Sequence, residues 1–239
     1  MSKKKIQPID DLRILDVRKP ATNYLTVNDN LPSAPFFCLC IAPPGSGKGV
    51  MAVSWIYRFY RNVFDTIYWC SPTLKMDNTL ALNIARDETI IKLDTAEDLE
   101  NMDSVIKNII ETQQKAKDED EDMEEVLIVL DDCISFINSR MILKLATMYR
   151  HLRISVLVSI QKMKMLSTSL RACASDVIVF QIPNLKQRTA FFEEFSIYPD
   201  IENYYEMATE KKYCYLRMDL RNMALYKGTP EGIEKIYQK

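Results

Sequence analysis

Glycine residues are rare in this chain, and their spacing gives the first indication of chemistry. Only five occur in 239 residues, and three of them fall within the run Ala42-Pro43-Pro44-Gly45-Ser46-Gly47-Lys48-Gly49. This run is close to the phosphate-binding pattern GxxxxGK[ST], in which backbone N–H groups surround a β-phosphate and the lysine reaches the β and γ oxygens. We therefore expect a nucleoside triphosphate to be bound by Pro44, Gly45, Ser46, Gly47, Lys48, Gly49 and Val50.

The residues on either side of this loop have the pattern that a phosphate-binding loop requires. Phe36 to Ile41 is a continuous apolar run, which is typical of a strand buried on both faces of a parallel sheet. After the loop, apolar residues from Val50 to Tyr60 recur at helical spacing and predict a helix over 50–61. The order of strand, glycine loop and helix favours phosphate binding over an incidental proline and glycine turn.

Two positions of the loop differ from the pattern. Ala42 replaces the leading glycine and is a tolerated small residue. Gly49 stands where Ser or Thr would place a hydroxyl on Mg²⁺, so water has to complete the shell of the ion. Neither Ser46 nor Ser54 is an obvious substitute for that hydroxyl. Metal affinity, and with it turnover, is therefore left open by the sequence.

A pair of acidic residues follows another apolar run. Val126 to Leu130 is typical of a buried strand, and Asp131 and Asp132 come directly after it. Beside a phosphate loop, the first carboxylate can hold Mg²⁺ through water, and the second can orient or deprotonate the attacking water. An aspartate after a strand is also a common turn or helix-capping residue. Together with the glycine loop, the pair predicts hydrolysis, with Asp131 at the metal and Asp132 catalytic.

Further apolar runs predict additional strands. Thr66 to Cys70 and Thr89 to Leu93 fit between the loop and the acidic pair, and Asp176 to Phe180 follows later. Ile154 to Ile160 is another predicted strand, and Gln161 comes directly after it. A polar side chain at the carboxyl end of a central strand can sense the γ-phosphate or place the attacking water, although a glutamine can equally leave the sheet into solvent.

Several of these runs resemble one known family. The run from Arg150 to Gln161, followed by Leu170-Arg171 and Asp176 to Phe180, resembles the viral genome-packaging ATPases of the FtsK/HerA superfamily. Phe64 to Thr73 is similar to the second strand of these proteins and its Ser-Pro exit. The resemblance spans about residues 36 to 183. Double-stranded DNA viruses of eukaryotes, from giant viruses to virophage-like elements, carry such proteins at about this length.

The resemblance implies roles for four of the residues already named. Lys48 would bind phosphate, Asp131 would serve Mg²⁺, and Asp132 would take the catalytic acidic role. Gln161 would act as the sensor of the γ-phosphate. The implied ligands are ATP and Mg²⁺.

The resemblance also implies a catalytic arginine. Family members act as rings in which an arginine of one subunit reaches the γ-phosphate of its neighbour, a task that suits a guanidinium because it stays charged and donates two parallel hydrogen bonds. Arg150, just before the sensor strand, is the first choice, with Arg153 and Arg171 as second choices. Each of the three could instead form an ordinary surface ion pair.

The whole pattern predicts an α/β fold: a three-layer P-loop NTPase of the RecA/ASCE-like type with a mainly parallel central sheet. Residues 1–30 are predicted to form an N-terminal arm and residues 31–239 the ATPase domain, with a motif core at about 36–183. Residues 184–239 are predicted to form a C-terminal extension, with helices near 185–195 and 200–209 and a hairpin of strands at 213–218 and 223–226.

Composition excludes several other classes of protein. Apolar residues make up 47% and charged residues 27%, as in ordinary folded proteins, and no apolar run is long enough to span a bilayer. The start of the chain lacks the pattern of a secretory signal. The six cysteines contain no CxxC pair and indicate reduced core residues, and the single histidine excludes histidine-based triads and metal sites. The acidic block from Asp118 to Glu125 is interpreted as a solvated loop.

DNA contact has only weak support in the sequence. The chain has a net charge of −2, so contact with DNA must come from local clusters or from several subunits together. Lys162 and Lys164 after Gln161, and later Lys186 and Arg188, are the nearest basic residues, although exposed lysines usually serve solubility. Aromatic residues recur at near-helical spacing after residue 190 and favour core packing or a subunit contact over base stacking: Phe191, Phe192, Phe195, Tyr204 and Tyr205.

The leading functional prediction is an ATP-hydrolysing motor that moves double-stranded viral DNA into a preformed capsid as a homo-oligomeric ring, a pentamer or hexamer. Its expected partners are double-stranded DNA and capsid or vertex proteins, with no membrane segment, and its expected location is the host cytoplasm or viral factory, with the virion as a further location. One alternative is a nucleotide-binding structural or regulatory subunit with impaired hydrolysis, because of Gly49. Another is a related DNA helicase or DNA pump.

Overall fold

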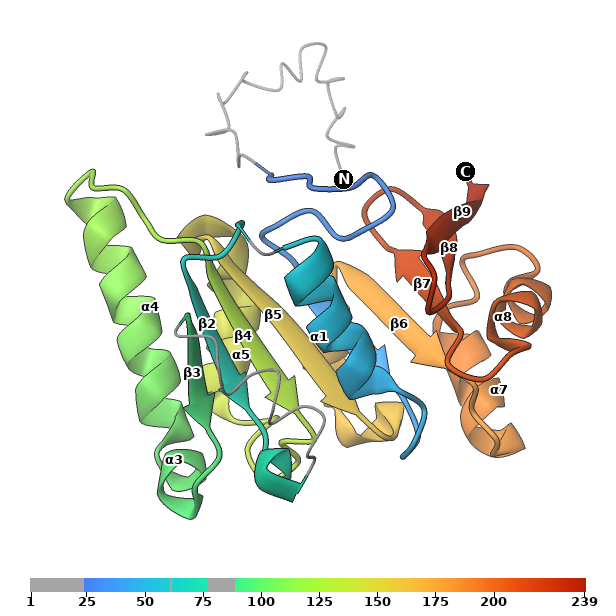
Figure 1. Cartoon of the computed structure of the whole chain (residues 1–239), viewed down its shortest axis with the longest axis horizontal. Helices are drawn as coiled ribbons and strands as arrows, with labels where there is room; N and C mark the ends of the chain where they lie inside the picture. Colours follow the sequence, from blue (N-terminus) through green and yellow to red (C-terminus); the bar gives the residue numbers. More distant parts are fainter. Residues whose placement is uncertain (1–23, 61, 77–88) are drawn as a thin grey trace, which may run out of the picture.

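Nine strands form one sheet in the part of the chain that the structure describes. The structure is a computed structural model, and it describes residues 24–60, 62–76 and 89–239 (Figure 1). The strands are β1 (Phe37–Ile41), β2 (Thr66–Cys70), β3 (Ile90–Leu93), β4 (Val126–Asp131), β5 (Ile154–Ile160), β6 (Asp176–Phe180), β7 (Tyr215–Asp219), β8 (Ala224–Gly228) and β9 (Ile233–Gln238). The α-helices are α1 (Lys48–Arg58), α3 (Ala96–Glu100), α4 (Met102–Asp118), α5 (Arg140–Met148), α6 (Thr168–Ala172), α7 (Leu185–Glu194) and α8 (Ile201–Thr209). Three short 3₁₀ helices are η1 (Leu74–Met76), η2 (Tyr149–Leu152) and η3 (Met163–Met165).

Strand β1 lies inside the sheet and has both faces covered. All five of its residues are buried, and successive side chains point to opposite faces. Leu39 and its neighbours two positions away belong to one apolar cluster, while Cys38 and Cys40 belong to the other. The cysteines face α1, which lies across that side of the sheet, and they are free thiols as predicted.

The helices form two layers around the sheet. On one face, α1 buries Met51, Trp55 and their helical neighbours against the strands. On the other face, α4, α5, α7 and α8 contribute to a second, larger core (Figure 1). Phe191 and Tyr205 are buried in that core, so the predicted packing role of these aromatic residues is confirmed. The predicted three-layer α/β class is likewise confirmed.

The strand order sets the geometry of the site. The sheet runs β3-β2-β4-β5-β1-β6-β7-β8-β9, and the six strands from β3 to β6 in this order are parallel. Strand β5 therefore separates β1 from β4, with Ile160 beside Ile41 and Ser159 beside Asp131. Because parallel strands end at the same edge, the residues that follow β1, β4 and β5 meet there.

The C-terminal extension adds three antiparallel strands and differs in detail from the prediction. The two predicted strands begin one or two residues later than expected, because Tyr213 and Met223 have φ values of 68° and 52° and so leave the extended conformation. The hairpin between them turns at residues 220–223, one residue later than the predicted 219–222. Strand β9 was not predicted. It is the outermost strand of the sheet, pairs with β8 and is only partly buried. Its sequence therefore lacks a continuous apolar run.

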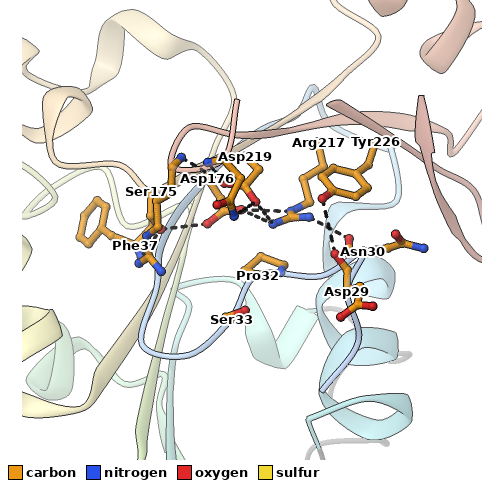
Figure 2. A network of polar contacts seen from close by, with 12 residues as sticks. Asp29, Asn30, Pro32, Ser33, Phe37, Ser175, Asp176, Arg217, Asp219 and Tyr226 are labelled. Carbon is orange, nitrogen blue, oxygen red and sulfur yellow. Dashed lines mark hydrogen bonds and ion pairs between the residues drawn. The ribbon is translucent and has the colours of Figure 1, made fainter. Parts of the chain in front are cut away.

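A buried ion-pair network joins β6 and β7 at the sheet edge opposite to the glycine loop (Figure 2). Arg217 is 1% exposed, and its guanidinium donates to Asp176 at 2.6 and 3.0 Å and lies 3.6 Å from Asp219. It also donates to the carbonyl of Asn30 at 2.8 Å and lies over the ring of Tyr226. The hydroxyl of Tyr226 donates to the carbonyl of Asp29, so the network anchors Asp29 and Asn30 to the sheet. Residues 1–23 of the predicted N-terminal arm lie outside the described residues.

Two further expectations concern the surface. After α4 ends at Asp118, residues 119–124 form a mainly exposed connection to β4, in agreement with the predicted acidic loop. Within the described ranges, no helix is both long and apolar enough to cross a membrane.

Candidate active site

The glycine loop adopts the backbone that its residues predict. Gly45 and Gly47 have φ values of 73° and 92°, in the left-handed region that glycine enters without steric cost. A Cβ atom at Gly47 would lie 2.9 Å from Cδ1 of Tyr213, so a side chain there would be both strained and crowded. Helix α1 begins directly after the loop, at Lys48, and thus presents its N-terminus to the loop.

Lys48 lies between the two predicted aspartates. Its Nζ atom is 3.1 Å from Oδ1 of Asp131 and donates a hydrogen bond to Oδ2 of Asp132. Burial lowers the pKa of Lys48, but the charge of Asp131 and the hydrogen bond and charge of Asp132 outweigh burial and leave that pKa above its ordinary value. Lys48 is therefore a protonated, positively charged ammonium group. A bound phosphate would compete with the two carboxylates for it.

The fold fixes both carboxylates. Asp131 is the last residue of β4, is 6% exposed, and its Oδ2 accepts a hydrogen bond of 3.3 Å from the hydroxyl of Ser71. Ser71 follows β2, the neighbour of β4. Asp132 leaves the strand with a φ of 53°, a left-handed conformation that Asp and Asn tolerate better than most residues. Its N–H still donates to the carbonyl of Ser159 at 2.9 Å, which holds the turn against β5.

A cavity of about 270 Å³ lies between the loop and the acidic pair. Its lining is formed by Gly45, Gly47, Lys48, Gly49, Val50, Thr73, Asp131, Asp132 and Tyr213. The donor set fits Mg²⁺, because the ion prefers carboxylate oxygens and Oδ1 of Asp131 is buried without a hydrogen-bond partner among the described residues. Asp131 is thus the residue that would hold the ion, directly or through water, which leaves Asp132 for the attacking water. The described residues contain no cluster of three His, Cys, Asp or Glu side chains that could hold a metal without a phosphate or water.

Gly49 borders a second, very small cavity of about 10 Å³ beneath the start of α1. Ser159 and Trp69 also line this cavity, and neither Oγ of Ser159 nor Nε1 of Trp69 has a hydrogen-bond partner among the described residues. The space approaches the size that one water molecule needs. A Ser or Thr at position 49 would bring a hydroxyl to this region, next to Asp131.

Replacing Gly49 with threonine is expected to tighten Mg²⁺ about tenfold, because the new hydroxyl supplies an oxygen ligand that glycine lacks. The measurement is the Mg²⁺ concentration that gives half-maximal ATP hydrolysis. Gly49→Ala is the matched control, since it adds helix propensity without an oxygen. An unchanged Mg²⁺ dependence in Gly49→Thr would show that another ligand already fills this position.

Gln161 lies where the strand order places it. It follows β5, whose neighbours β1 and β4 lead into the glycine loop and the acidic pair, so Gln161 lies between those two features along the sheet edge. The N–H of Ala42 donates to the carbonyl of Ile160 at 2.9 Å, which ties the start of the loop to the end of β5. The sensor role of Gln161 stays a prediction.

The three arginines differ sharply in their surroundings. Arg150 is exposed in η2, before β5, and therefore lies at the opposite edge of the sheet from the loop of its own chain, about 23 Å away for a seven-residue strand. Arg153 donates to the carbonyl of Met123 at 3.0 Å, and Arg171 forms a two-point ion pair with Glu194 at 2.6 and 3.1 Å. Arg150 is thus too far from the loop of its own chain to contact a phosphate bound there.

Several exposed lysines share the sheet edge that carries the loop. Lys162 and Lys164 are exposed just after β5, and Lys186 is exposed at the start of α7, after β6. Lys211 and Lys212 are exposed at the same edge, because β7 runs antiparallel to β6 and they precede it. The last two were not predicted.

Sequence reasoning missed three residues around the phosphate cavity. Tyr213 lies against Gly47, Thr73 lines the cavity, and Ser71 holds Asp131. Ser71 and Thr73 belong to the Ser-Pro exit of the second strand, whose sequence alone does not indicate a contact with the acidic pair. Tyr213 had no sequence signal, because only the pairing of β6 with β7 brings it to the loop.

The chain matches one family model, described as the Poxvirus A32 protein, over residues 26–188. Solved structures also resemble it. The DNA-packaging ATPase B204 from Sulfolobus Turreted Icosahedral Virus has a TM-score of 0.55 and 15% identity, with 86% of this chain and 98% of B204 covered. The structure of B204 from Sulfolobus turreted icosahedral virus 2 in complex with ATP-gammaS has a TM-score of 0.55 and 15% identity. The match covers 80% of this chain and 94% of that B204 chain.

A conjugation protein has a similar fold. The pCW3 conjugation coupling protein TcpA, with ATPgS, has a TM-score of 0.53 and 10% identity, with 77% of this chain and 57% of TcpA covered. No curated sequence relative of the chain is detected. The family match confirms the predicted resemblance to viral genome-packaging ATPases of the FtsK/HerA superfamily, and the structures confirm the P-loop NTPase fold. The giant-virus or virophage type stays a prediction. Since the match includes the glycine loop, the acidic pair and Gln161, the chain belongs to the Poxvirus A32 protein family of packaging ATPases.

Proposed function

We propose that this chain is an ATP-hydrolysing motor that moves double-stranded viral DNA into a preformed capsid as a homo-oligomeric ring. One observation carries the proposal: Lys48 of the glycine loop lies in ion-pair contact with Asp131 and Asp132, beside a cavity of about 270 Å³. This arrangement combines a phosphate-binding cation with the acidic pair that hydrolysis needs. The similar fold of B204, which is a DNA-packaging ATPase, supports the DNA-packaging part.

The residues of the site would share the work of hydrolysis. Backbone N–H groups of the loop and the N-terminus of α1 bind the phosphates, and Lys48 leaves its carboxylate partners to contact the β and γ oxygens. Mg²⁺, when bound, neutralises developing charge on the phosphates. Asp132 orients the attacking water and accepts its proton, while Gln161 positions that water against the γ-phosphate.

The ring and the DNA contact rest on the placement of charged residues. Arg150 is exposed at the sheet edge opposite to the loop, so a ring that sets this edge against a neighbour's loop edge would place its guanidinium near the neighbour's γ-phosphate. Exposed lysines at the loop edge supply positive charge for the DNA backbone, with Lys162 and Lys164 as the first candidates. Ring size is a pentamer or hexamer in this proposal, and capsid or vertex proteins are the docking partners, in the host cytoplasm, the viral factory or the virion.

Gly49 supports a second candidate function, a nucleotide-binding structural or regulatory subunit with impaired hydrolysis. Glycine offers no ligand at the position where the pattern has a hydroxyl, so Mg²⁺ would be held less well. The fold likeness to TcpA keeps a related DNA pump or helicase as a third.

ATP turnover is expected in the wild-type chain, stimulated by double-stranded DNA, and expected to fall at least about a hundredfold in Lys48→Ala, because the phosphates lose the cation that stabilises their charge. The measurement is phosphate release with and without DNA for both chains. Lys164→Ala, which changes an exposed lysine outside the cavity, is the control and should lower only the DNA stimulation. If the wild type shows no turnover that depends on Lys48, the motor proposal fails in favour of the nucleotide-binding subunit.

A further inference from the structure

A large, mainly apolar cavity lies next to the phosphate cavity. Its volume is about 360 Å³, within the range of small-molecule sites. One wall is the exposed side of α1, including Val50, Ser54 and Arg58. The opposite wall is formed by the C-terminal extension, with Tyr213 and residues 229–233.

The two cavities share residues. Gly47, Val50 and Tyr213 line both of them. Val50 is 60% exposed on the first turn of α1, two residues beyond Lys48, so the apolar cavity begins where the phosphate loop ends. A nucleotide whose phosphates lie on the loop therefore has this cavity within reach of its base.

A hydrogen bond joins the two walls of the apolar cavity. The indole nitrogen of Trp55 donates to the hydroxyl of Tyr215 at 3.0 Å, which fastens α1 to β7 beneath the cavity. The ring of Tyr213 lies against Gly47, and the residue is 47% exposed. Nζ of Lys212 lies over the same ring, 4.7 Å from its centre, so a base that stacks there shares the ring with this ammonium group or displaces it. A partly exposed aromatic ring beside an apolar cavity offers a base a stacking surface.

We propose that this cavity holds the base of the bound nucleotide, stacked against Tyr213, so that the C-terminal extension completes the nucleotide site. The inference rests on the proposed function, since it takes the phosphates to lie on the glycine loop. It assigns the extension a direct part in binding ATP.

The polar groups of the cavity predict weak discrimination between purines. The hydroxyl of Thr229 is already used within its own turn, in contacts with Glu231 and Gly232. Arg58 lies over the ring of Phe59, 5.3 Å from its centre, and contacts the carbonyl of Pro230 at 3.5 Å. A mainly apolar site cannot strongly reject a base that differs only in its polar edge groups. We therefore expect ATP and GTP to bind within about tenfold of each other.

The test compares ATP, GTP and inorganic tripolyphosphate by calorimetry on the full chain. Tyr213→Ala is expected to weaken ATP about tenfold or more through loss of stacking, while tripolyphosphate changes less than about threefold. Tyr213→Phe keeps the ring and is expected to restore ATP binding. Ser54→Trp fills the cavity from α1 and is expected to weaken ATP about tenfold, again without affecting tripolyphosphate.

Three results would overturn the base pocket. ATP affinity could be unchanged in both Tyr213→Ala and Ser54→Trp, ATP and tripolyphosphate could weaken equally in Tyr213→Ala, or Tyr213→Phe could behave like Tyr213→Ala. A preference between ATP and GTP above about a hundredfold would overturn the predicted tolerance. Failure of the proposed function looks different, because a wild-type chain that binds neither ATP nor tripolyphosphate has no working phosphate loop.

Discussion

Asp132→Asn is expected to lower the rate of ATP hydrolysis by about 10²–10⁴-fold while ATP still binds, because the substitution removes the base that accepts the proton of the attacking water. Asparagine suits the test, since it also tolerates the left-handed backbone that Asp132 adopts, with a φ of 53°. The measurements are phosphate release and ATP affinity on the same preparation.

ATP affinity is expected to stay the same or to rise in Asp132→Asn. The carboxylate of Asp132 holds Lys48 in this structure and would repel the γ-phosphate, so its removal frees the ammonium group and relieves repulsion. A loss of ATP binding equal to the loss of turnover would contradict the catalytic role and would assign Asp132 to binding.

An experiment that mixes Arg150→Ala subunits with Asp132→Asn subunits tests the role of Arg150. If Arg150 acts on a neighbouring subunit, Arg150→Ala alone is inactive, and mixed rings with Asp132→Asn recover part of the activity, because some interfaces then join an intact arginine to an intact aspartate. Arg153→Ala is the comparison variant, as this arginine already contacts Met123 and Glu125. Mixtures that stay inactive would argue against an arginine acting across subunits at position 150.

Arg217→Met is expected to destabilise the fold by about 3–5 kcal/mol, because Asp176 and Asp219 are then buried without a cation. For a chain of this length, the loss corresponds to a fall in melting temperature of roughly 6–20 °C. Lys107→Met is the control, since Lys107 and Glu111 form an exposed pair on α4 and such pairs contribute less than about 1 kcal/mol.

The pH dependence of Arg217→Met separates lost charge pairing from lost packing. Burial raises the pKa of Asp176, and Arg217 opposes burial without cancelling it. A carboxyl group whose pKa is raised by folding favours the folded state more as the pH falls, because the folded state then binds the extra proton. The instability of Arg217→Met relative to wild type should therefore shrink as pH is lowered toward the raised pKa. If the stability that Arg217→Met loses relative to wild type is the same at every pH, lost packing is the cause.

Most of the elements near the site could be predicted from sequence for a simple reason. Strands β2, β5 and β6 have the predicted bounds, because strands covered on both faces appear as mostly apolar runs. The glycine loop was equally visible, since its backbone φ values require glycine at positions 45 and 47. By contrast, the long amphipathic helix α4 was not delimited and β9 was missed, because half-exposed elements carry mixed polar and apolar residues.

The sequence by itself determined the chemistry of the site: a phosphate loop, Lys48, and an acidic pair at the end of a buried strand, all of them local patterns. Only the tertiary structure decided what surrounds them. Strand order placed β5 between the loop strand and the acidic strand, and the reversal of β7 brought Tyr213 against Gly47 from more than 160 residues away. The pairing of Arg217 with Asp176 likewise spans 41 positions. Such contacts join segments whose separation along the chain carries no periodic signal, so they follow from packing of the whole sheet.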